Sequence, residues 1–251
     1  MSLSDFEALS FDCYGTLIDW ETGIIEALKP LSERAKRNLT RNQILEAHAR
    51  HESSQQRQTP TMRYRDLLSI VYKRLAEEWS LAPTHEECVE YGRSVGSWPA
   101  FSDSAAALQY LKKRFKLAIL SNVDNESFAR SNKRLGVEFD AVYTAEDVGA
   151  YKPSARNFEY MLEKLAGLGI ARGKLLHTAE SLFHDHRPAN DFKLKSCWIY
   201  RRHADEGFGA TMHPGEAPKV DFKFNSMGDL VKAHQAEAER SGARNAIGRS
   251  A

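Results

Sequence analysis

The stretch LSFDCYGTLIDW, residues 9–20, begins as an apolar run, reaches an aspartate at Asp12 and turns at Gly15. An apolar run of this length before a glycine turn is typical of a buried strand and its exit loop. A carboxylate in that position often serves the turn alone, but in a parallel sheet the carboxyl ends of the strands are also where active sites form. The residue two places later is Tyr14, so a second acid is missing there.

The 75 or so residues after this strand show only helical periodicity. Thr40 with Gln43 and Thr84 with Glu87 have the spacing of capping boxes, so two helix starts are marked independently of the apolar pattern. No strand pattern interrupts the four helical segments, which span residues 22–31, 40–50, 63–79 and 84–95. This region is predicted to be a helical insertion.

From residue 98 onward, strand and helix patterns alternate. Strands are predicted at 116–122, 139–146, 174–181, 197–201 and 220–224, and helices at 104–114, 126–136, 154–169 and 187–195, with a long Gly- and Pro-rich loop at 201–218. Such alternation predicts an α/β fold with a doubly wound, mostly parallel, Rossmann-like sheet. The core would comprise residues 1–17 and 98–251, with an all-helical cap at 18–97 and a disordered polar tail at about 238–251.

Composition narrows the possible partners and location. The 251 residues carry 35 Lys and Arg against 34 Asp and Glu, with no run of like charge that would favour nucleic acid. Three widely separated cysteines, Cys13, Cys88 and Cys197, favour a reducing compartment. We expect a cytoplasmic monomer or homodimer that binds a small molecule, and neither nucleic acid nor a membrane.

The ends of the predicted strands bring together residues from four distant segments. They are Asp12, Ser121 with Asn122, Lys152 in the segment YKP, and Glu180 with Asp185 in the segment AESLFHD. Each alone is a common turn or cap residue. Their order along the chain, all in loops on one edge of the predicted sheet, makes a catalytic site the better explanation.

These segments, in this order, resemble the haloacid dehalogenase superfamily of hydrolases, in which a helical cap follows the first of four motifs. The resemblance covers residues 6 to 230. DCYGTL is similar to the form found in type II 2-haloacid dehalogenases. The segments FDCYGTLIDWETGI (11–24), SWPAF (97–101) and HTAESLFHDH (177–186) also resemble azetidine-2-carboxylate hydrolases.

The resemblance implies a catalytic group of Asp12, Lys152 and Asp185. Asp12 would be a nucleophile that forms an aspartyl ester, and the positive charge of Lys152 would keep it ionised. Asp185, or Glu180, would deliver water to the ester. Residues expected to bind or orient the substrate are Tyr14, Thr16, Ser121, Asn122, Glu180 and Ser181.

The leaving group is the main open question. Phosphatases of the superfamily usually have a second acid where this chain has Tyr14, and a tyrosine is a poor proton donor at neutral pH. A halide, or an amine that enters already protonated, needs no proton. The chain lacks two donors of the dehalogenase pattern, at Leu182 and Phe158, and gains an acid at Glu180, which favours a cationic substrate group over a halide.

The cap contributes the less certain candidates. Arg50, next to Glu52 in helical terms, is the nearest candidate for the arginine that receives halide in the dehalogenases. Residues that could line a cleft between cap and core are Trp20, Glu52, Tyr64, Trp98, Phe101 and Phe158. His184 is expected to support the site, and His177 and His186 to be structural.

Two further functions stay open. The chain could be a magnesium phosphatase with Asp12, Glu180 and Asp185 as ligands, although the expected chemistry on carbon requires no cofactor. It could also be an inactive protein that binds small acids. Retention of Asp12, Lys152 and Asp185 argues against inactivity, because buried charges without a use are costly.

Overall fold

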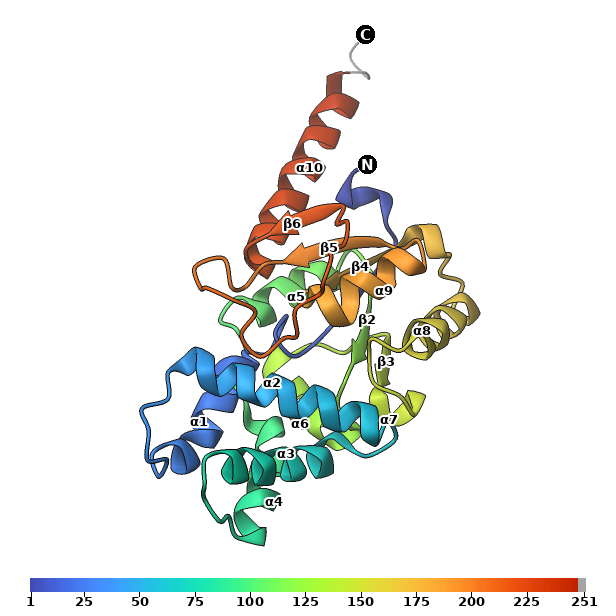
Figure 1. The fold of residues 1–251 in the computed structure, drawn as a ribbon. Coiled ribbons are helices and arrows are strands. Elements are labelled where there is room, and N and C mark those ends of the chain that lie inside the picture. The colour runs from blue at the N-terminus through green and yellow to red at the C-terminus, as the bar shows by residue number, and fades with distance from the viewer. Residues whose placement is uncertain (248–251) are drawn as a thin grey trace.

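A six-stranded parallel sheet forms the centre of the molecule (Figure 1). The computed structural model describes the backbone of residues 1–247 and the side chains of residues 1–241. The strands lie in the order β3-β2-β1-β4-β5-β6, with the bounds β1 Ala8–Phe11, β2 Lys116–Ser121, β3 Ala141–Thr144, β4 Leu175–Ala179, β5 Lys195–Ile199 and β6 Phe222–Phe224. The predicted α/β fold class is therefore confirmed, and β1 lies between β2 and β4.

Helices cover both faces of this sheet because the strand side chains alternate in direction. Leu9, Phe11 and Ile119 belong to one apolar cluster with α5 (Ser104–Lys112), α6 (Asn125–Leu135) and α10 (Met227–Ile247). Ala8 and Leu120 belong to a second cluster with α8 (Ala155–Gly167) and α9 (Arg187–Asp191). Because both faces are apolar, the polar side chains that follow the strands gather at the sheet edge.

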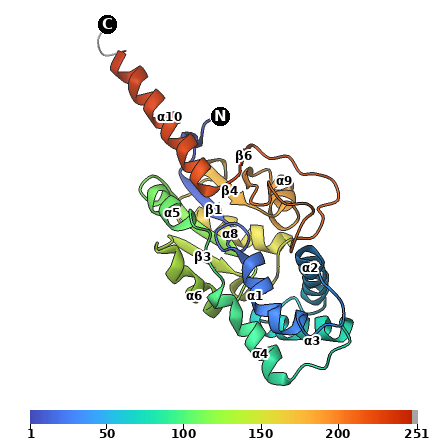
Figure 2. The same ribbon diagram turned by 90° about the vertical axis from the view of Figure 1, so that its left-hand side faces the viewer.

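The cap consists of four helices at the end of the molecule opposite α10 (Figure 2). They are α1 (Trp20–Ser32), α2 (Arg41–Gln58), α3 (Tyr64–Glu78) and α4 (His85–Ser94), followed by a 3₁₀ turn at Val95–Ser97. Both predicted capping boxes, Thr40 with Gln43 and Thr84 with Glu87, are present. None of the described helices has the length and apolar content needed to cross a membrane.

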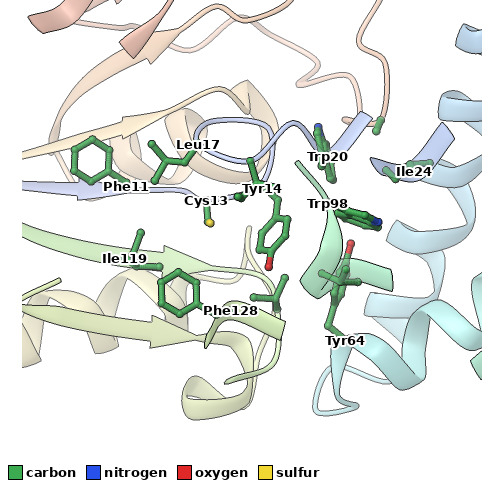
Figure 3. Close-up of a cluster of buried hydrophobic side chains, with 14 of the residues drawn as sticks. Phe11, Cys13, Tyr14, Leu17, Trp20, Ile24, Tyr64, Trp98, Ile119 and Phe128 are labelled. Atoms are coloured by element: carbon green, nitrogen blue, oxygen red, sulfur yellow. The ribbon is translucent and has the colours of Figure 1, made fainter. Parts of the chain in front are cut away.

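Cap and core join through paired connections and a shared apolar cluster. Ile18, on the way out of the core, forms an isolated antiparallel bridge with Ala100, on the way back. Figure 3 shows Tyr14, Trp20 and Trp98 grouped between the core strands and the cap helices. The cluster that covers one face of the sheet continues through these rings into the cap, so the cap has no apolar core separate from it.

Three local expectations differ from the structure. The predicted strand at 139–146 ends at Thr144, because Thr144 and Asp147 form a capping box that begins the short helix α7 (Ala145–Val148). The predicted helix at 187–195 ends at Asp191. The expected disorder from about residue 238 is wrong for residues 238–247, which continue α10. Met227 and Leu230 anchor that helix by burial, and the segment is rich in helix-forming Ala, Glu and Arg. Residues 248–251 lie outside the described part of the chain.

The close approach of α1 to Trp98 gives a test of the joint between cap and core. A Cβ at Gly23 would lie 2.2 to 2.6 Å from three atoms of Trp98, too close for any packed pair. We expect Gly23→Ala to lower the free energy of unfolding by about 1–3 kcal/mol, measured by urea denaturation, because α1 must move away from the indole. Gly167→Ala is the control, since a Cβ there meets nothing within 4 Å. Equal stability changes in the two variants would contradict this account.

Candidate active site

The predicted site residues converge where the central strands end. β1, β2 and β4 are neighbours in the sheet, so the segments after Phe11, Ser121 and Ala179 start side by side. The Asp12 backbone N–H still donates to Thr178 O on β4 at 3.1 Å, which fixes where its side chain leaves the sheet. Asp185 comes from a single π-helical turn at Leu182–His186.

Lys152 is the centre of this group. Its ammonium Nζ donates to Asp12 Oδ1 at 2.9 Å, to Asp185 Oδ1 at 2.7 Å and to the carbonyl of Leu120 at 2.9 Å. An ammonium has three N–H donors, so each has an acceptor. The exposed fractions of the three residues are 1% for Lys152, 6% for Asp12 and 0% for Asp185, so this is a buried ion triad.

Two other side chains complete the bonding of the carboxylates. Thr16 Oγ1 donates to Asp12 Oδ2 at 2.9 Å and accepts from the Glu180 backbone N–H at 2.9 Å. His177 Nε2 donates to Asp185 Oδ1 at 2.9 Å, and His177 Nδ1 lies 2.9 Å from the Ser10 hydroxyl. The sequence predicted His177 only as a structural residue, and its contact with Asp185 depends on the π-helical turn at Leu182–His186, which spacing does not reveal.

The charges of the triad shift the pKa values of its members in different directions. Burial disfavours the charged form of Lys152, but the two carboxylates outweigh it and raise the Lys152 pKa. Burial also opposes ionisation of Asp185, yet Lys152 and His177 together hold its pKa below the ordinary aspartate value. The pKa of Asp12 is raised by burial and by the nearby charge of Asp185, against the opposing effects of Lys152 and Thr16. Asp185 is therefore the more firmly ionised carboxylate.

The triad forms one wall of a small cavity between core and cap. The cavity is small: the volume open to the centre of a water-sized sphere is about 30 Å³, which is more than a single water molecule needs. Core and cap both contribute to its lining, which consists of Asp12, Tyr14, Trp20, Glu52, Gln56, Tyr64, Ser121, Asn122, Val123, Lys152, Ser181, His184 and Asp185. Gln56 and Val123 were not expected; Gln56 lies one helical turn after Glu52 and so shares its face.

Several expected binding residues line this cavity but have partners within the protein. Asn122 Nδ2 donates to Lys152 O at 3.0 Å, and its Oδ1 accepts from Lys152 N at 2.6 Å, so Asn122 positions the lysine backbone. Ser181 Oγ accepts from the His184 backbone N–H at 3.0 Å. The Ser121 hydroxyl is buried and has no hydrogen-bond partner among the described residues, so it is available to a ligand.

Tyr14 lines the cavity, but its hydroxyl is hydrogen-bonded to a residue of the core. Its Oη lies 2.8 Å from Ser131 Oγ on α6, and Trp98 packs edge-on against its ring with 5.9 Å between centroids. Burial raises the Tyr14 pKa well above the usual range for tyrosine. A proton donor for a leaving group is therefore absent at this position in the structure as well as in the sequence.

Four expected residues lie outside the cavity. Arg50 is exposed and pairs with Glu78 on α3 at 2.8 Å, because its side chain leaves the opposite face of α2. Trp98 is buried beneath Tyr14, and its Nε1 donates to Ser94 Oγ. Phe158 is fully buried against His177 and Phe192. Thr16 lies outside the cavity lining but orients the Asp12 carboxylate through its hydroxyl. Placing Arg50, Trp98 and Phe158 at the cleft surface was wrong, whereas Trp20, Glu52 and Tyr64 do line the cavity.

Glu180 also lies away from the cavity, which removes the predicted magnesium ligand set. Its carboxyl accepts from Thr211 Oγ1 at 3.4 Å and lines a neighbouring pocket with Glu21 and Arg202. Burial and then the charges of Glu21 and Asp12 raise its pKa to about 8. Asp12 and Asp185 both accept from Lys152, whose positive charge occupies the place between them. Across the described residues, no three acidic, histidine or cysteine side chains are arranged to hold a metal ion.

Comparison with known proteins agrees with this geometry at the level of family. The haloacid dehalogenase-like hydrolase family matches residues 6–177, more than half of the chain. The chain belongs to this family of hydrolases. No curated protein sequence matches it.

Solved structures show the same fold at low sequence identity. A defluorinating L-2-haloacid dehalogenase superposes with a TM-score of 0.74 at 20% identity, covering 93% of this chain and 98% of its own. The L-2-haloacid dehalogenase from Xanthobacter autotrophicus, with chloropropionic acid covalently bound, gives 0.72 at 18% identity, covering 90% and 97%. The hydrolase YfnB from Bacillus subtilis, of the same superfamily and bound to magnesium, gives 0.70 at 17% identity, covering 92% and 99%.

The triad predicts a strong effect of removing its cation. We expect Lys152→Met to lower the free energy of unfolding by about 3–5 kcal/mol near neutral pH, because two buried carboxylates lose their counter-charge. Asp185 has a lowered pKa in the folded state, so its contribution is present above the ordinary aspartate pKa and is lost as the pH falls. The gap between wild type and variant should therefore narrow in acid. Urea denaturation of wild type and variant, once near neutral pH and once in acid, measures this difference in the free energy of unfolding.

Lys133→Met, at an exposed position on α6, is the control for this experiment. It should change stability by less than about 0.5 kcal/mol. A Lys152→Met protein that is as stable as the control at neutral pH would show that the triad carries no net stabilising charge interaction.

Proposed function

We propose that this hydrolase displaces a group from carbon 2 of a small 2-substituted carboxylic acid, with Asp12 as the nucleophile and an aspartyl ester as the intermediate. The observation that carries the proposal is the carboxylate of Asp12, which faces a small cavity while Lys152 holds one of its oxygens and Thr16 the other. Such support orients the carboxylate and opposes its protonation. A carboxylate in this setting is suited to nucleophilic attack.

The second step of the proposed reaction is hydrolysis of the ester. Asp185 Oδ2 is buried with no hydrogen-bond partner among the described residues, so it is free to accept from a water molecule. His184 also lines the cavity, and burial lowers its pKa to about 4, which leaves it neutral near pH 7. We therefore assign water activation to Asp185, with His184 beside it.

Two leaving groups fit the first step. The Xanthobacter relative carries chloropropionic acid, which supports a haloacid as substrate. Against that, Arg50 is not at the cavity, and the cap supplies a carboxyl, Glu52, instead. A carboxyl there favours a cationic nitrogen, so ring opening of azetidine-2-carboxylate to 4-amino-2-hydroxybutyrate is the second candidate.

The remaining alternatives have less support. A magnesium phosphatase would use Glu180 as a ligand, and that carboxyl faces Thr211 and Glu21. An inactive binding protein would have no need for a buried lysine between two aspartates, since such a triad is costly to maintain without a use. The experiment below separates all of these.

Asp12→Asn should abolish turnover, reducing the rate by about 10³-fold or more, because an amide cannot form the ester. Purified protein is offered 2-chloropropionate, azetidine-2-carboxylate and 4-nitrophenyl phosphate, each with and without magnesium. Release of chloride, of 4-amino-2-hydroxybutyrate and of nitrophenol is measured. Turnover of the phosphate alone, dependent on magnesium, would overturn the proposal, and binding of an acid without turnover would support an inactive binder.

Isotope labelling tests the intermediate. In a single turnover in water enriched in ¹⁸O, the product should carry unlabelled oxygen, because that atom comes from Asp12. The label should appear in the peptide that contains Asp12, as measured by mass spectrometry. Label that enters the product directly in the first turnover would mean that water attacks the substrate itself.

A further inference from the structure

A buried carboxyl on the cap side of the cavity has no role in the steps described so far. Glu52 lies on α2, is 4% exposed and lines the cavity that contains Asp12. Tyr64, on α3, donates its hydroxyl to Glu52 Oε1 at 2.6 Å. No described Lys or Arg pairs with Glu52, in contrast to Asp12 and Asp185, which share Lys152.

The surroundings of Glu52 keep its proton available near neutral pH. Burial raises its pKa to about 7, with the Tyr64 hydrogen bond acting in the opposite direction. Every other titratable group around it is neutral, or already bonded in the triad. These groups are Tyr64 on α3, Tyr91 on α4, Tyr151 before Lys152, His48 one turn earlier on α2, and Asp12, Lys152, His184 and Asp185 across the cavity.

Displacement at carbon requires the leaving group to depart on the side opposite the nucleophile. Asp12 lies on the core side, so a group displaced by it moves toward the cap side. That side is formed by Trp20, Glu52, Gln56 and Tyr64, and Glu52 is the acid among them. Among the carboxyls that line the cavity, Asp185 has a lowered pKa and lies on the core side, and Glu52 has a raised pKa and lies on the cap side, a separation typical of paired base and acid.

We propose that Glu52, oriented by Tyr64, protonates the departing atom, and that the site accepts small acids whose leaving atom is a ring oxygen, as in an epoxy acid. This rests on the proposed function, since it adds a proton donor to attack by Asp12. It assigns to the cap the acid that is missing at Tyr14. A carboxyl with a pKa near the working pH is well suited to this transfer.

Oxirane-2-carboxylate is the smallest acid of this class and serves as the example for the proposed step. An Asp12 carboxylate oxygen forms a bond to carbon 2, the bond from carbon 2 to the ring oxygen breaks, and its electron pair takes the proton from Glu52. Water then attacks the ester carbonyl and gives one proton to Asp185, which releases glycerate and the Asp12 carboxylate. That proton returns through solvent to Glu52, so the net reaction is addition of one water.

The test compares two substrates and matched variants. Oxirane-2-carboxylate needs a proton on its leaving atom, and 2-chloropropionate does not. We expect Glu52→Gln to lower kcat/KM for the epoxy acid by about 10²–10⁴-fold and for the chloro acid by less than about tenfold. Glu78→Gln is the control, because it makes the same change at an acid of the cap that faces Arg50 and not the cavity. It should leave both activities unchanged.

The pH profile adds a readout that a structural role would not change. Activity on the epoxy acid should fall as the pH rises above about 7, because the donor loses its proton, and this limb should be absent in Glu52→Gln. Tyr64→Phe, which removes the orienting hydroxyl, should lower kcat for the epoxy acid more than it changes KM. Should Glu52→Gln fail to fold, Tyr64→Phe and the titration of the Glu52 carboxyl still test the proposal.

Protein labelled with ¹³C at the glutamate carboxyls permits a measurement that does not depend on turnover. The resonance absent from Glu52→Gln, or displaced in Tyr64→Phe, should titrate near pH 7. Titration at the ordinary glutamate value would overturn the assignment of a proton donor. So would equal losses for both substrates, or turnover of the chloro acid with none of the epoxy acid. Epoxide opening that survives Asp12→Asn, or no turnover of the chloro acid, the epoxy acid and azetidine-2-carboxylate, would overturn the proposed function.

Discussion

The buried ammonium of Lys152 is the interaction on which the rest of the site depends. All three of its N–H donors are used, by Asp12, by Asp185 and by the carbonyl of Leu120 in β2. Asp12 and Asp185 lie in the segments after β1 and β4, and Leu120 lies within β2, so the lysine fixes the relative positions of segments that are far apart in sequence. Two carboxylates buried this close to each other would repel strongly without it. The sheet brings the acids together, and the lysine makes that proximity stable.

Core and cap both supply ionisable groups to the cavity around this lysine. The carboxylates of the core, Asp12 and Asp185, share the positive charge of Lys152, which opposes the rise in pKa that burial causes in each. Glu52 of the cap has no such partner among the described residues, and burial raises its pKa to about 7 against the opposing effect of the Tyr64 hydrogen bond. The same cavity therefore holds carboxyls that differ in proton affinity, although their side chains are chemically similar.

The core of the site could be predicted from the sequence because strand ends are readable from local pattern. Asp12, Ser121, Lys152 and Asp185 each follow a strand or precede a helix that short-range periodicity reveals, and a parallel sheet must gather them at one edge. The cap is different. Arg50 and Glu52 are two residues apart on one helix, and which of them faces the cavity depends on how α2 is rotated against α3 and the core. Local pattern gives a helix and its apolar face but not that rotation, so Arg50 and Glu52 were both placed at the cavity, where only Glu52 lies.

The side-chain directions of Glu180 and Thr16 could not be predicted for the same reason. Both lie within motifs that mark the site, yet Glu180 directs its carboxyl to Thr211 in the long loop, and Thr16 acts on Asp12 from outside the cavity. A motif identifies the segment that reaches the sheet edge. The direction of each side chain within it depends on partners from elsewhere in the chain. For Glu180 that partner lies in residues 201–218, the stretch whose course is hardest to foresee.

The bridge between Ile18 and Ala100 bears on how the sequence of this protein can vary through evolution. Because the chain leaves the core and returns to it at adjacent points, the core meets the whole helical insertion as it would meet a tight turn. The strands that position Asp12 can keep the same order whatever the length of the inserted segment. Substitutions in the helices can thus change the groups that face the substrate, Glu52 among them, while the order of the strands that position Asp12 stays the same.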